Sequence, residues 1–335
     1  MQAIVIGHRG ASGHRPEHTR AAFNLAFGLG ADAVEPDLVA TRDGVLVIRH
    51  ENEISGTTDV ATRAEFGARR TEKHVDGKLV TGWFTEDFTW AELSTLRARE
   101  RLPNLRQSNT TFDGQQPILR LRDLFDLVDA AAEQTDRVLG IVAEIKHGNY
   151  FAGLDLPLAE LFAAEVSAAG WNTDRLTVES FEPSVLARVR AEGVRGKRIF
   201  LLEDQGYPAD QVAEHGAGAL RYIDHLTPDG LANLAAGENI DGISVPKSLI
   251  LETDDVGDVV GASALVDDAH KAGLEIYCWT LRPENKFLAK TFRRGIRRAD
   301  FGHWQAEFRL ILETGIDGVF VDHPDLAVHV RDGLR

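Results

Sequence analysis

The sequence is poor in cysteine: its only one is Cys278, so no disulfide can form within the chain. Cys278 lies in the apolar run 276–279, where we expect a buried small hydrophobic side chain, because a thiol nucleophile would need a partner histidine that the sequence does not place. The chain also lacks any run of about eighteen apolar residues, which excludes a membrane-spanning helix. No internal repeat of about twenty to fifty residues occurs, which excludes a solenoid or a propeller.

The N-terminal residues 1–6 have no basic segment and no long apolar stretch, so they do not resemble a signal peptide. We expect a cytoplasmic protein from the sequence as it stands, or a secreted or periplasmic one if a leader has been removed. Acidic residues outnumber basic ones, 52 against 37, which gives a formal net charge of −15. This charge disfavours binding to nucleic acid and to anionic membranes, and it suits a protein that holds a divalent cation.

Eight short apolar segments recur along the chain, and most of them precede a helix-length pattern. They span residues 3–7, 33–39, 138–145, 176–180, 198–202, 241–245, 275–280 and 317–321. Serine or proline comes before the predicted helices at 185–192 and 264–272, and glycine follows both of them and a third predicted helix at 305–314. Continuous apolar strands that alternate with helices indicate a parallel sheet covered on both faces. The pattern predicts an α/β fold, a (β/α)8 TIM barrel, with a doubly wound open sheet as the alternative.

A ninth apolar segment follows the second predicted strand across Asp43-Gly44, which is a strong hairpin signal. We therefore interpret residues 45–50 as the return arm of a hairpin that brings His50 back toward the end of that strand. Residues 51–117 break the strand–helix rhythm, and we expect an insertion subdomain within a single barrel domain, 1–335. Its one clear helix is predicted at 91–101, behind a capping box of Thr89 and Glu92.

A second irregular stretch spans residues 282–303 and contains a basic run at 290–298. We expect this run to form a solvated helix face. The alternative is a loop that faces the substrate.

Two carboxylates, Glu35 and Asp37, interrupt the second apolar strand and, being two residues apart, share one face of it. Burying two like charges together is costly unless something compensates, and a divalent cation with oxygen ligands would do so. A solvent-facing acidic pair is the other interpretation.

Glu144 and Lys146 repeat this spacing at the carboxyl end of the third predicted strand, the end at which (β/α)8 enzymes carry their chemistry. Glu144 could complete a cation site, and Lys146 could bind phosphate or balance the acids. The alternative is a structural ion pair between the two side chains.

His8 and Arg9 follow the first strand between Gly7 and Gly10, where the backbone can approach a ligand closely. The guanidinium fork of arginine suits phosphate oxygens. With His50 nearby, two histidines beside one cation suggest a general acid and a general base, although a single histidine at a strand end is more often structural.

Taken in order, these motifs resemble the glycerophosphodiester phosphodiesterases along nearly the whole chain. The motifs are His8-Arg9-Gly10, Pro16-Glu17-His18-Thr19, Glu35-Pro36-Asp37, Asp43-Gly44, His50, Glu144-Ile145-Lys146, Ser180-Phe181-Glu182-Pro183, Trp279-Thr280 and Asp317-Gly318-Val319-Phe320-Val321-Asp322-His323-Pro324. The long insertion is similar to that of the larger bacterial members, which are often secreted or periplasmic.

The resemblance implies roles for seven residues. Glu35, Asp37 and Glu144 would bind the metal, His8 and His50 would be the acid–base pair, and Arg9 and Lys146 would hold the phosphate. Calcium is the favoured metal and magnesium the alternative.

The sequence departs from the family's pattern at two positions. His18 stands where the family usually has Asn, and we expect it to cap or brace the helix that begins near Thr19. Glu51 stands where Asp often follows the second histidine, which puts any role of that carboxylate in doubt.

Phe181 and Trp279 lie at strand ends, where their rings could line the glycerol side of a substrate or simply pack in the core. The reaction implied by the family is metal-dependent hydrolysis of a small-molecule glycerophosphodiester to sn-glycerol 3-phosphate and an alcohol, through a cyclic phosphate. Two other functions are weighed: a lipid phosphodiesterase similar to lysophospholipase D or sphingomyelinase D, which would want apolar loops such as Trp83-Phe84 and Phe88, and a non-catalytic barrel that binds phosphate esters. The oligomeric state and the preferred alcohol stay open.

Overall fold

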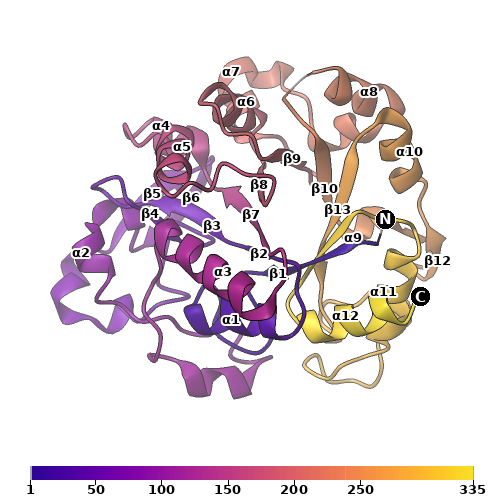
Figure 1. Ribbon diagram of the computed structural model, residues 1–335, viewed down its shortest axis with the longest axis horizontal. Coiled ribbons are helices and arrows are strands. Elements are labelled where there is room, and N and C mark those ends of the chain that lie inside the picture. Colours follow the sequence, from indigo (N-terminus) through magenta and orange to yellow (C-terminus); the bar gives the residue numbers. More distant parts are fainter. Residues whose placement is uncertain (1, 238, 335) are drawn as a thin grey trace.

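The structure, a computed structural model, describes residues 2–237 and 239–334. Within them, eight parallel strand positions form a closed ring, because the first strand pairs with the last (Figure 1). In ring order the strands are β1 (Ile4–His8), β2 (Ala33–Glu35) continued by β3 (Asp37–Ala40), β7 (Gly140–Ile145), β8 (Leu176–Ser180), β9 (Lys197–Leu201), β10 (Gly242–Pro246), β13 (Glu275–Leu281) and β14 (Gly318–Val321). The predicted (β/α)8 barrel is confirmed, and the open sheet is excluded.

The second barrel strand, expected as one piece, is divided at Pro36 into β2 and β3. Proline has no amide hydrogen to donate to a neighbouring strand. The register is nevertheless kept, since Val34 pairs with Ile141 and Asp37 pairs with Glu144 of β7. The Pro36 carbonyl still accepts a hydrogen bond from the Glu144 amide at 3.0 Å. The break therefore leaves Glu35 and Asp37 in the barrel wall.

The alternation of side chains along each strand separates an apolar floor from a polar mouth inside the barrel. A small buried cluster fills the interior of the ring: Ile6, Ala33, Val142, Ile199, Tyr277 and Phe320. Two residues further along three of these strands come His8, Glu35 and Glu144, so they point to the same interior one layer higher. The apolar layer thus fills the barrel interior below His8, Glu35 and Glu144, which lie at the carboxyl ends of the strands.

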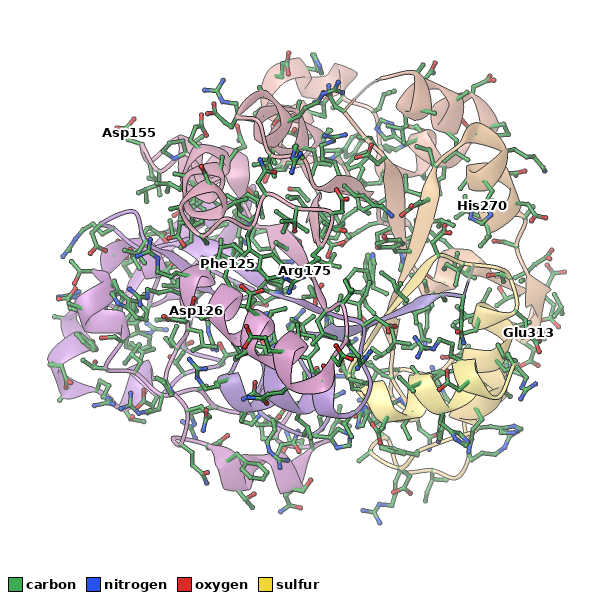
Figure 2. All side chains as sticks on the ribbon, viewed as in Figure 1. Phe125, Asp126, Asp155, Arg175, His270 and Glu313 are labelled. Carbon is green, nitrogen blue, oxygen red and sulfur yellow. The ribbon has the colours of Figure 1, made fainter. Side chains whose placement is uncertain are left out.

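The larger core lies between the strands and the helices that surround them. The helices are α1 (Arg20–Gly28), α2 (Trp90–Leu93), α3 (Leu121–Thr135), α4 (Gly148–Ala152), α5 (Leu158–Ala168), α6 (Pro183–Ala191), α7 (Ala209–His215), α8 (Pro228–Ala236), α9 (Lys247–Ile250), α10 (Leu265–Ala272), α11 (Trp304–Leu312) and α12 (Pro324–Asp332). The three helices predicted from the residues at their ends correspond to α6, α10 and α11. Gly193, Gly273 and Gly315, which follow them, have φ of 83–84°, where glycine carries no steric cost. Figure 2 shows side chains filling the space between ring and helices.

The predicted hairpin is confirmed, because β4 (Leu46–Ile48) runs antiparallel to β3 across the turn at Gly44. Cys278 is fully buried, as expected, and its burial raises the pKa of the thiol. Outside the ring lie two further two-stranded sheets, β5 (Thr71–Val75) with β6 (Lys78–Gly82) and β11 (Leu251–Thr253) with β12 (Val259–Ala262). No helix in the described part of the chain has both the length and the apolarity to cross a bilayer.

Two expectations about irregular segments are wrong. The capping box of Thr89 and Glu92 is present, but α2 ends at Leu93 instead of residue 101. Arg97 and Ala98 instead form isolated β-bridges with Pro117 and Thr58, since tertiary pairing outweighs the local helical signal.

The basic run at 290–298 is mostly exposed to solvent, as expected. It is not a helix face, because only Lys290–Phe292 forms a short 3-10 turn.

Candidate active site

A cavity of about 1030 Å³ opens at the carboxyl ends of the barrel strands. The residues singled out in the sequence converge on it from separate strands: His8, Arg9, Glu35, His50, Glu144, Lys146, Phe181 and Trp279 all line it. Asp37 lies directly beside them, completely buried. The basic run 290–298 does not line this cavity, so the substrate-facing alternative for that run is wrong for the described chain.

Three carboxylates form a tight group at the bottom of the cavity. One oxygen each of Glu35, Glu144 and Glu179 lies within 4.8 Å of the others, and all three residues are buried. Glu144 and Glu179 are direct partners on β7 and β8. Sequence reasoning missed Glu179, although a signal existed, because it is a lone carboxylate in the apolar segment 176–180, one place before the end of the strand.

Asp37 is not one of these three residues, but it is the strand partner of Glu144 and lies against Arg9, His18 and Lys146. Its Oδ2 is 3.3 Å from Arg9 Nε and 3.2 Å from His18 Nε2, and its Oδ1 is 3.6 Å from Lys146 Nζ. Lys146 Nζ also lies 2.6 Å from Glu144 Oε1. Two cationic side chains therefore already balance part of the buried negative charge.

The surroundings of these carboxylates shift their pKa values in opposite directions. Burial raises the pKa of Glu144 to about 8, and burial with neighbouring carboxylates raises the pKa of Glu35 and of Glu179 well above the usual value. Burial would also raise the pKa of Asp37, but Lys146, His50 and Arg9 together lower it well below its usual value. The group has more negative charge than its own side chains neutralise, so it favours an added cation.

His8 is oriented by Asp322, whose Oδ1 lies 2.6 Å from His8 Nδ1. A carboxylate can only accept, so Nδ1 carries the proton and Nε2 is left as the acceptor. His8 Nε2 lies 3.8 Å from Glu35 Oε2, at the carboxylate group. Burial, and then the charge of Arg9, lowers the pKa of His8 to about 4.

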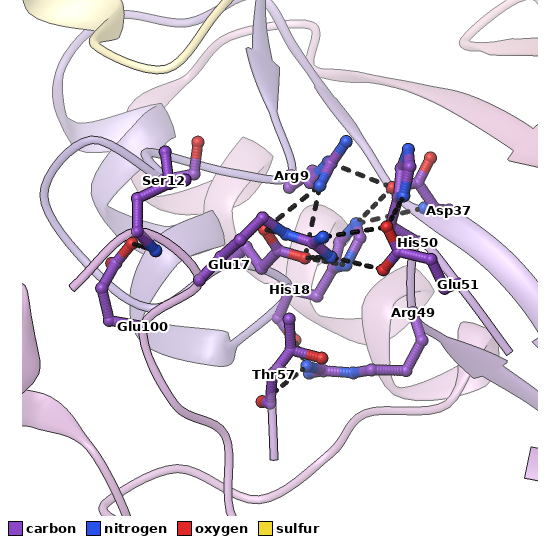
Figure 3. A network of polar contacts seen from close by, with 12 residues as sticks. Arg9, Ser12, Glu17, His18, Asp37, Arg49, His50, Glu51, Thr57 and Glu100 are labelled. Atoms are coloured by element: carbon purple, nitrogen blue, oxygen red, sulfur yellow. Dashed lines mark hydrogen bonds and ion pairs between the residues drawn. The ribbon is translucent and has the colours of Figure 1, made fainter. Parts of the chain in front are cut away.

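His50 has the same arrangement with a different partner, as Figure 3 shows. Its Nδ1 lies 2.6 Å from Glu51 Oε1, so the carboxylate that departs from the family's Asp holds this ring. Burial, followed by Arg9 and Lys146, lowers the pKa of His50 to about 3. Both imidazoles are therefore neutral at neutral pH, with Nε2 unprotonated in each.

His18 is completely buried and does not cap α1, so the first of its two expected roles is wrong, whereas its ring does lie against Phe23 of that helix, with centroids 6.3 Å apart. Thr19 caps α1, because its Oγ1 accepts a hydrogen bond from the Ala22 amide at 3.1 Å. His18 Nε2 instead accepts from the Asp37 amide at 3.3 Å. The histidine that replaces the family's usual Asn thus braces Asp37.

Aromatic rings form one wall of the cavity next to the cationic groups. Phe181 makes edge-to-face contacts with Trp279 and Tyr222, each with centroids 6.0 Å apart. Lys146 Nζ lies 5.6 Å from the centroid of the Phe181 ring. The turn of the β5–β6 hairpin contributes Asp76, Gly77 and Lys78 to the outer part of the cavity.

The mouth of this (β/α)8 barrel combines buried carboxylates, cationic side chains and two histidines that carboxylates orient. This combination is typical of a hydrolytic enzyme that acts on an anionic ester. The comparison with known families is specific: residues 8–326 match the "Glycerophosphoryl diester phosphodiesterase family". The chain belongs to this family, whose members are glycerophosphodiester phosphodiesterases.

Individual glycerophosphodiester phosphodiesterases are similar to this chain in sequence. The chain is 28% identical to glycerophosphodiester phosphodiesterase GDPD6 of Arabidopsis thaliana, over 95% of this chain and 82% of that protein. It is 25% identical to glycerophosphodiester phosphodiesterase of Haemophilus influenzae, over 99% of this chain and 90% of that protein.

Two solved structures illustrate the shared fold. A glycerophosphoryl diester phosphodiesterase from Silicibacter pomeroyi aligns with a TM-score of 0.65 at 20% identity, covering 99% of this chain and 94% of that one. An Oleispira antarctica phosphodiesterase, solved in complex with the product sn-glycerol-3-phosphate, aligns with a TM-score of 0.59 at 19% identity, covering 99% and 97%.

Proposed function

We propose that this enzyme hydrolyses glycerophosphodiesters to sn-glycerol 3-phosphate and an alcohol, using one divalent cation and the acid–base pair His8 and His50. The observation that carries the proposal is the convergence of two carboxylate-oriented histidines on one cavity with Arg9 and Lys146. The product complex of the Oleispira antarctica relative supports the identity of the product.

The residues at the bottom of the cavity fit a hard divalent cation. Both carboxylate oxygens of Glu179 are buried without a hydrogen-bond partner, and those of Asp37 have ion-pair contacts at 3.2 Å or more but no hydrogen bond. Such oxygens are costly to leave unmatched, and oxygen ligands are those that Ca²⁺ and Mg²⁺ prefer. Glu35, Asp37 and Glu144 would hold the ion, Ca²⁺ in preference to Mg²⁺, and Glu179 would be an additional ligand. When bound, the ion would neutralise charge on the phosphoryl oxygens.

The chain's own cationic groups would bind the phosphate. Arg9 and Lys146 now lie against Asp37 and Glu144, the same carboxylates that would hold the ion. A cation on those carboxylates would take over the neutralisation, and both side chains would then be available to phosphoryl oxygens. Charge-assisted hydrogen bonds from Arg9 and Lys146 would stabilise the charge that develops there during reaction.

The two histidines would move the protons. One Nε2 accepts the proton of the glycerol hydroxyl next to the phosphoester while its oxygen attacks phosphorus. The other histidine, which takes up a proton at Nε2 from solvent when the anionic phosphodiester binds, gives that proton to the oxygen of the departing alcohol as the P–O bond breaks. Water then opens the resulting cyclic phosphate with the proton transfers reversed, which leaves sn-glycerol 3-phosphate.

The two alternative functions are less well supported. The aromatic residues expected in an apolar lipid-facing loop, Trp83, Phe84 and Phe88, are all buried. A decayed barrel that only binds phosphate esters would be expected to have lost a proposed ligand or one of the histidines. All seven residues are present, and both histidines have an orienting carboxylate.

A panel of glycerophosphodiesters with different alcohols, assayed after EDTA treatment and again with Ca²⁺ or Mg²⁺ restored, tests the proposal. We expect sn-glycerol 3-phosphate to appear only with the metal. Release of a phosphomonoester of the alcohol, full activity after EDTA, or activity only toward lysophospholipids would each overturn it.

A further inference from the structure

We propose that Arg101 and Arg106, which lie in the segment 51–117 outside the barrel strands, are positioning residues for the two histidines of the active site. Each arginine holds the carboxylate that orients one histidine ring. The inference rests on the proposed acid–base role of His8 and His50, and it assigns to the inserted segment a part in the chemistry at the barrel mouth.

Arg101 serves the His50 side of the site. Its Nη1 and Nη2 donate to Glu51 Oε1 and Oε2 at 2.8 and 2.6 Å, which is a two-pronged contact with the carboxylate that holds His50. Its Nε and Nη2 donate to Glu17 at 2.7 Å, and Glu17 in turn lies 3.2 Å from Arg9 Nη1. Figure 3 shows Glu17, Glu51 and His50 within this network. Arg101 thereby fixes the neighbours of both a histidine and the phosphate-side arginine.

Arg106 serves the His8 side in the same way. Its Nη2 donates to Asp322 Oδ2 at 2.5 Å, while the other oxygen of Asp322 faces His8. Its Nε donates to Glu284 at 2.7 Å, and its Nη1 donates to the Ser12 carbonyl at 3.1 Å. All three nitrogens of the buried fork therefore have acceptors, which leaves the guanidinium a single orientation.

The geometry explains why an arginine beside the carboxylate matters to the histidine. A planar guanidinium that binds the carboxylate prevents the carboxylate from rotating. The hydrogen bond between that carboxylate and Nδ1 of the imidazole ring therefore has a fixed direction. Burial raises the pKa of both carboxyl groups, but Arg282 and then Arg106 lower the pKa of Asp322, and His50 and then Arg101 lower that of Glu51. Arg282 Nε also donates to Asp322 Oδ2 at 2.6 Å, so Arg106 shares this carboxylate with a second arginine. Each carboxylate therefore stays ionised and only accepts. Nδ1 therefore keeps its proton, and Nε2 of each ring faces the reaction.

The two sides of this region differ in exposure: the side chains of Arg106 and Asp322 are 6% and 2% exposed, whereas those of Arg101 and Glu51 are 28% and 38% exposed. Arg101 and Arg106 line a second cavity of about 20 Å³ together with His8, Arg9, Glu17 and Asp322. Such a volume has room for about one water molecule. The segment is further anchored by Glu100, which accepts from the Leu102 amide at 2.7 Å and from Asn109 at 3.1 Å. The charges on the His8 side are thus shielded from solvent, whereas those on the His50 side are partly exposed.

The test compares Arg101→Met and Arg106→Met with a matched control, Arg99→Met, in the metal-loaded full-length enzyme. Arg99 lies in the same segment, its side chain is 48% exposed, and its nearest acidic partner is Asp113 at 3.7 Å. We expect kcat to fall about 10- to 100-fold in each test variant, the usual loss for a group that orients a functional side chain. KM should change less than about threefold, and Arg99→Met should behave as the unaltered protein.

A spectroscopic measurement separates positioning from simple support of the fold. Nitrogen-15 NMR of the histidine side chains, assigned with His8→Gln and His50→Gln, should show one Nδ1-protonated tautomer at each site. Arg101→Met should mix the tautomers at His50 but leave His8 unchanged, and Arg106→Met should do the reverse. Arg101→Lys, which keeps the charge but loses the fork, should restore only part of kcat.

The outcomes are distinct. Unchanged kcat and unchanged tautomers in Arg101→Met, when His50→Ala is strongly impaired, would overturn this inference alone. Unimpaired His50→Ala would instead overturn the proposed function, whatever the tautomers show. If Arg106→Met does not fold, Arg106→Lys takes its place, and unchanged kcat and His8 tautomer in that variant would remove Arg106 from the proposal.

Discussion

His8 and Asp322 are 314 positions apart in the chain, yet His8 Nδ1 and Asp322 Oδ1 lie 2.6 Å from each other. The contact follows from closure of the barrel, since β1 pairs with β14 and Gly7 is the direct partner of Val321. His8 follows Gly7 and Asp322 follows Val321, so the two side chains come to lie next to each other. The orientation of one proposed catalytic histidine therefore depends on the strand pairing that closes the ring, and disturbing that closure should affect chemistry as well as stability.

His8→Ala and His50→Ala should each lower kcat by about 10²–10⁴, the usual contribution of a positioned proton donor or acceptor. Metal affinity, measured by calorimetry, should change little, because the proposed ligands are all carboxylate oxygens. The double variant should be less impaired than the product of the single losses, since both groups act on one transition state. A loss below about tenfold for either single variant on a natural substrate would contradict the acid–base pair.

A substrate with an acidic leaving group should identify which histidine is the general acid. Release of p-nitrophenolate needs little protonation, so the variant that lacks the general acid should recover most of its activity on such a substrate. The variant that lacks the general base should remain impaired. Equal recovery of both variants, measured as kcat/KM relative to the unaltered enzyme, would show that neither histidine protonates the leaving alcohol.

Glu179→Gln should weaken binding of Ca²⁺ by about 10- to 100-fold, because a buried carboxylate without partners would be lost from the metal site. The same change should not destabilise the metal-free protein, since burial and the neighbouring carboxylates already disfavour the ionised form of Glu179. Calorimetric titration and thermal unfolding measure the two effects. Glu203→Gln, at a cavity-lining but exposed position, is the matched control. Equal Ca²⁺ affinity in both variants would exclude Glu179 as a ligand.

Trp279→Ala should raise KM more than it lowers kcat if the indole only provides binding surface for the substrate. Trp279 lines the cavity and packs edge-to-face on Phe181, so Trp279→Phe should restore part of the loss in KM. Steady-state kinetics beside a thermal melt distinguish this from a role in packing. A variant whose melting temperature falls while KM of the folded fraction is unchanged would assign Trp279 to the core.

Glu182 should make the metal-free protein less stable as pH rises from about 4.5 to 7. Burial raises the pKa of Glu182 from 4.5 to about 7, although it accepts a hydrogen bond from the Asn149 amide. Between these values the folded state keeps a proton that the unfolded state has released, so the free energy of unfolding falls with increasing pH. The loss would be on the order of 2–3 kcal/mol.

Glu182→Gln keeps the carbonyl that accepts from Asn149 but cannot ionise. The difference between the unfolding free energies of the two proteins, measured by denaturant titration at several pH values, should therefore change in this interval. A difference independent of pH between 4.5 and 7 would show that Glu182 titrates normally.

The sequence by itself determined the barrel and most of the residues at its mouth. Strand and helix periods depend on neighbouring residues, so the apolar segments and the helix-ending Gly193, Gly273 and Gly315 are readable locally. The two-residue spacing of Glu35 with Asp37, and of Glu144 with Lys146, fixed which side chains share a face of a strand. Once the ring is closed, those faces meet at one end of the barrel.

Only the tertiary structure decided what surrounds those residues. Glu179 is visible in the sequence as a lone carboxylate in an apolar segment, but only the pairing of β7 with β8 places it beside Glu144. Arg101, expected within a helix, instead lies in an irregular segment where Glu17 and Glu51 hold its guanidinium. The strength of an ion pair depends on the distance and burial of groups far apart in the chain, and these exist only after the chain has folded.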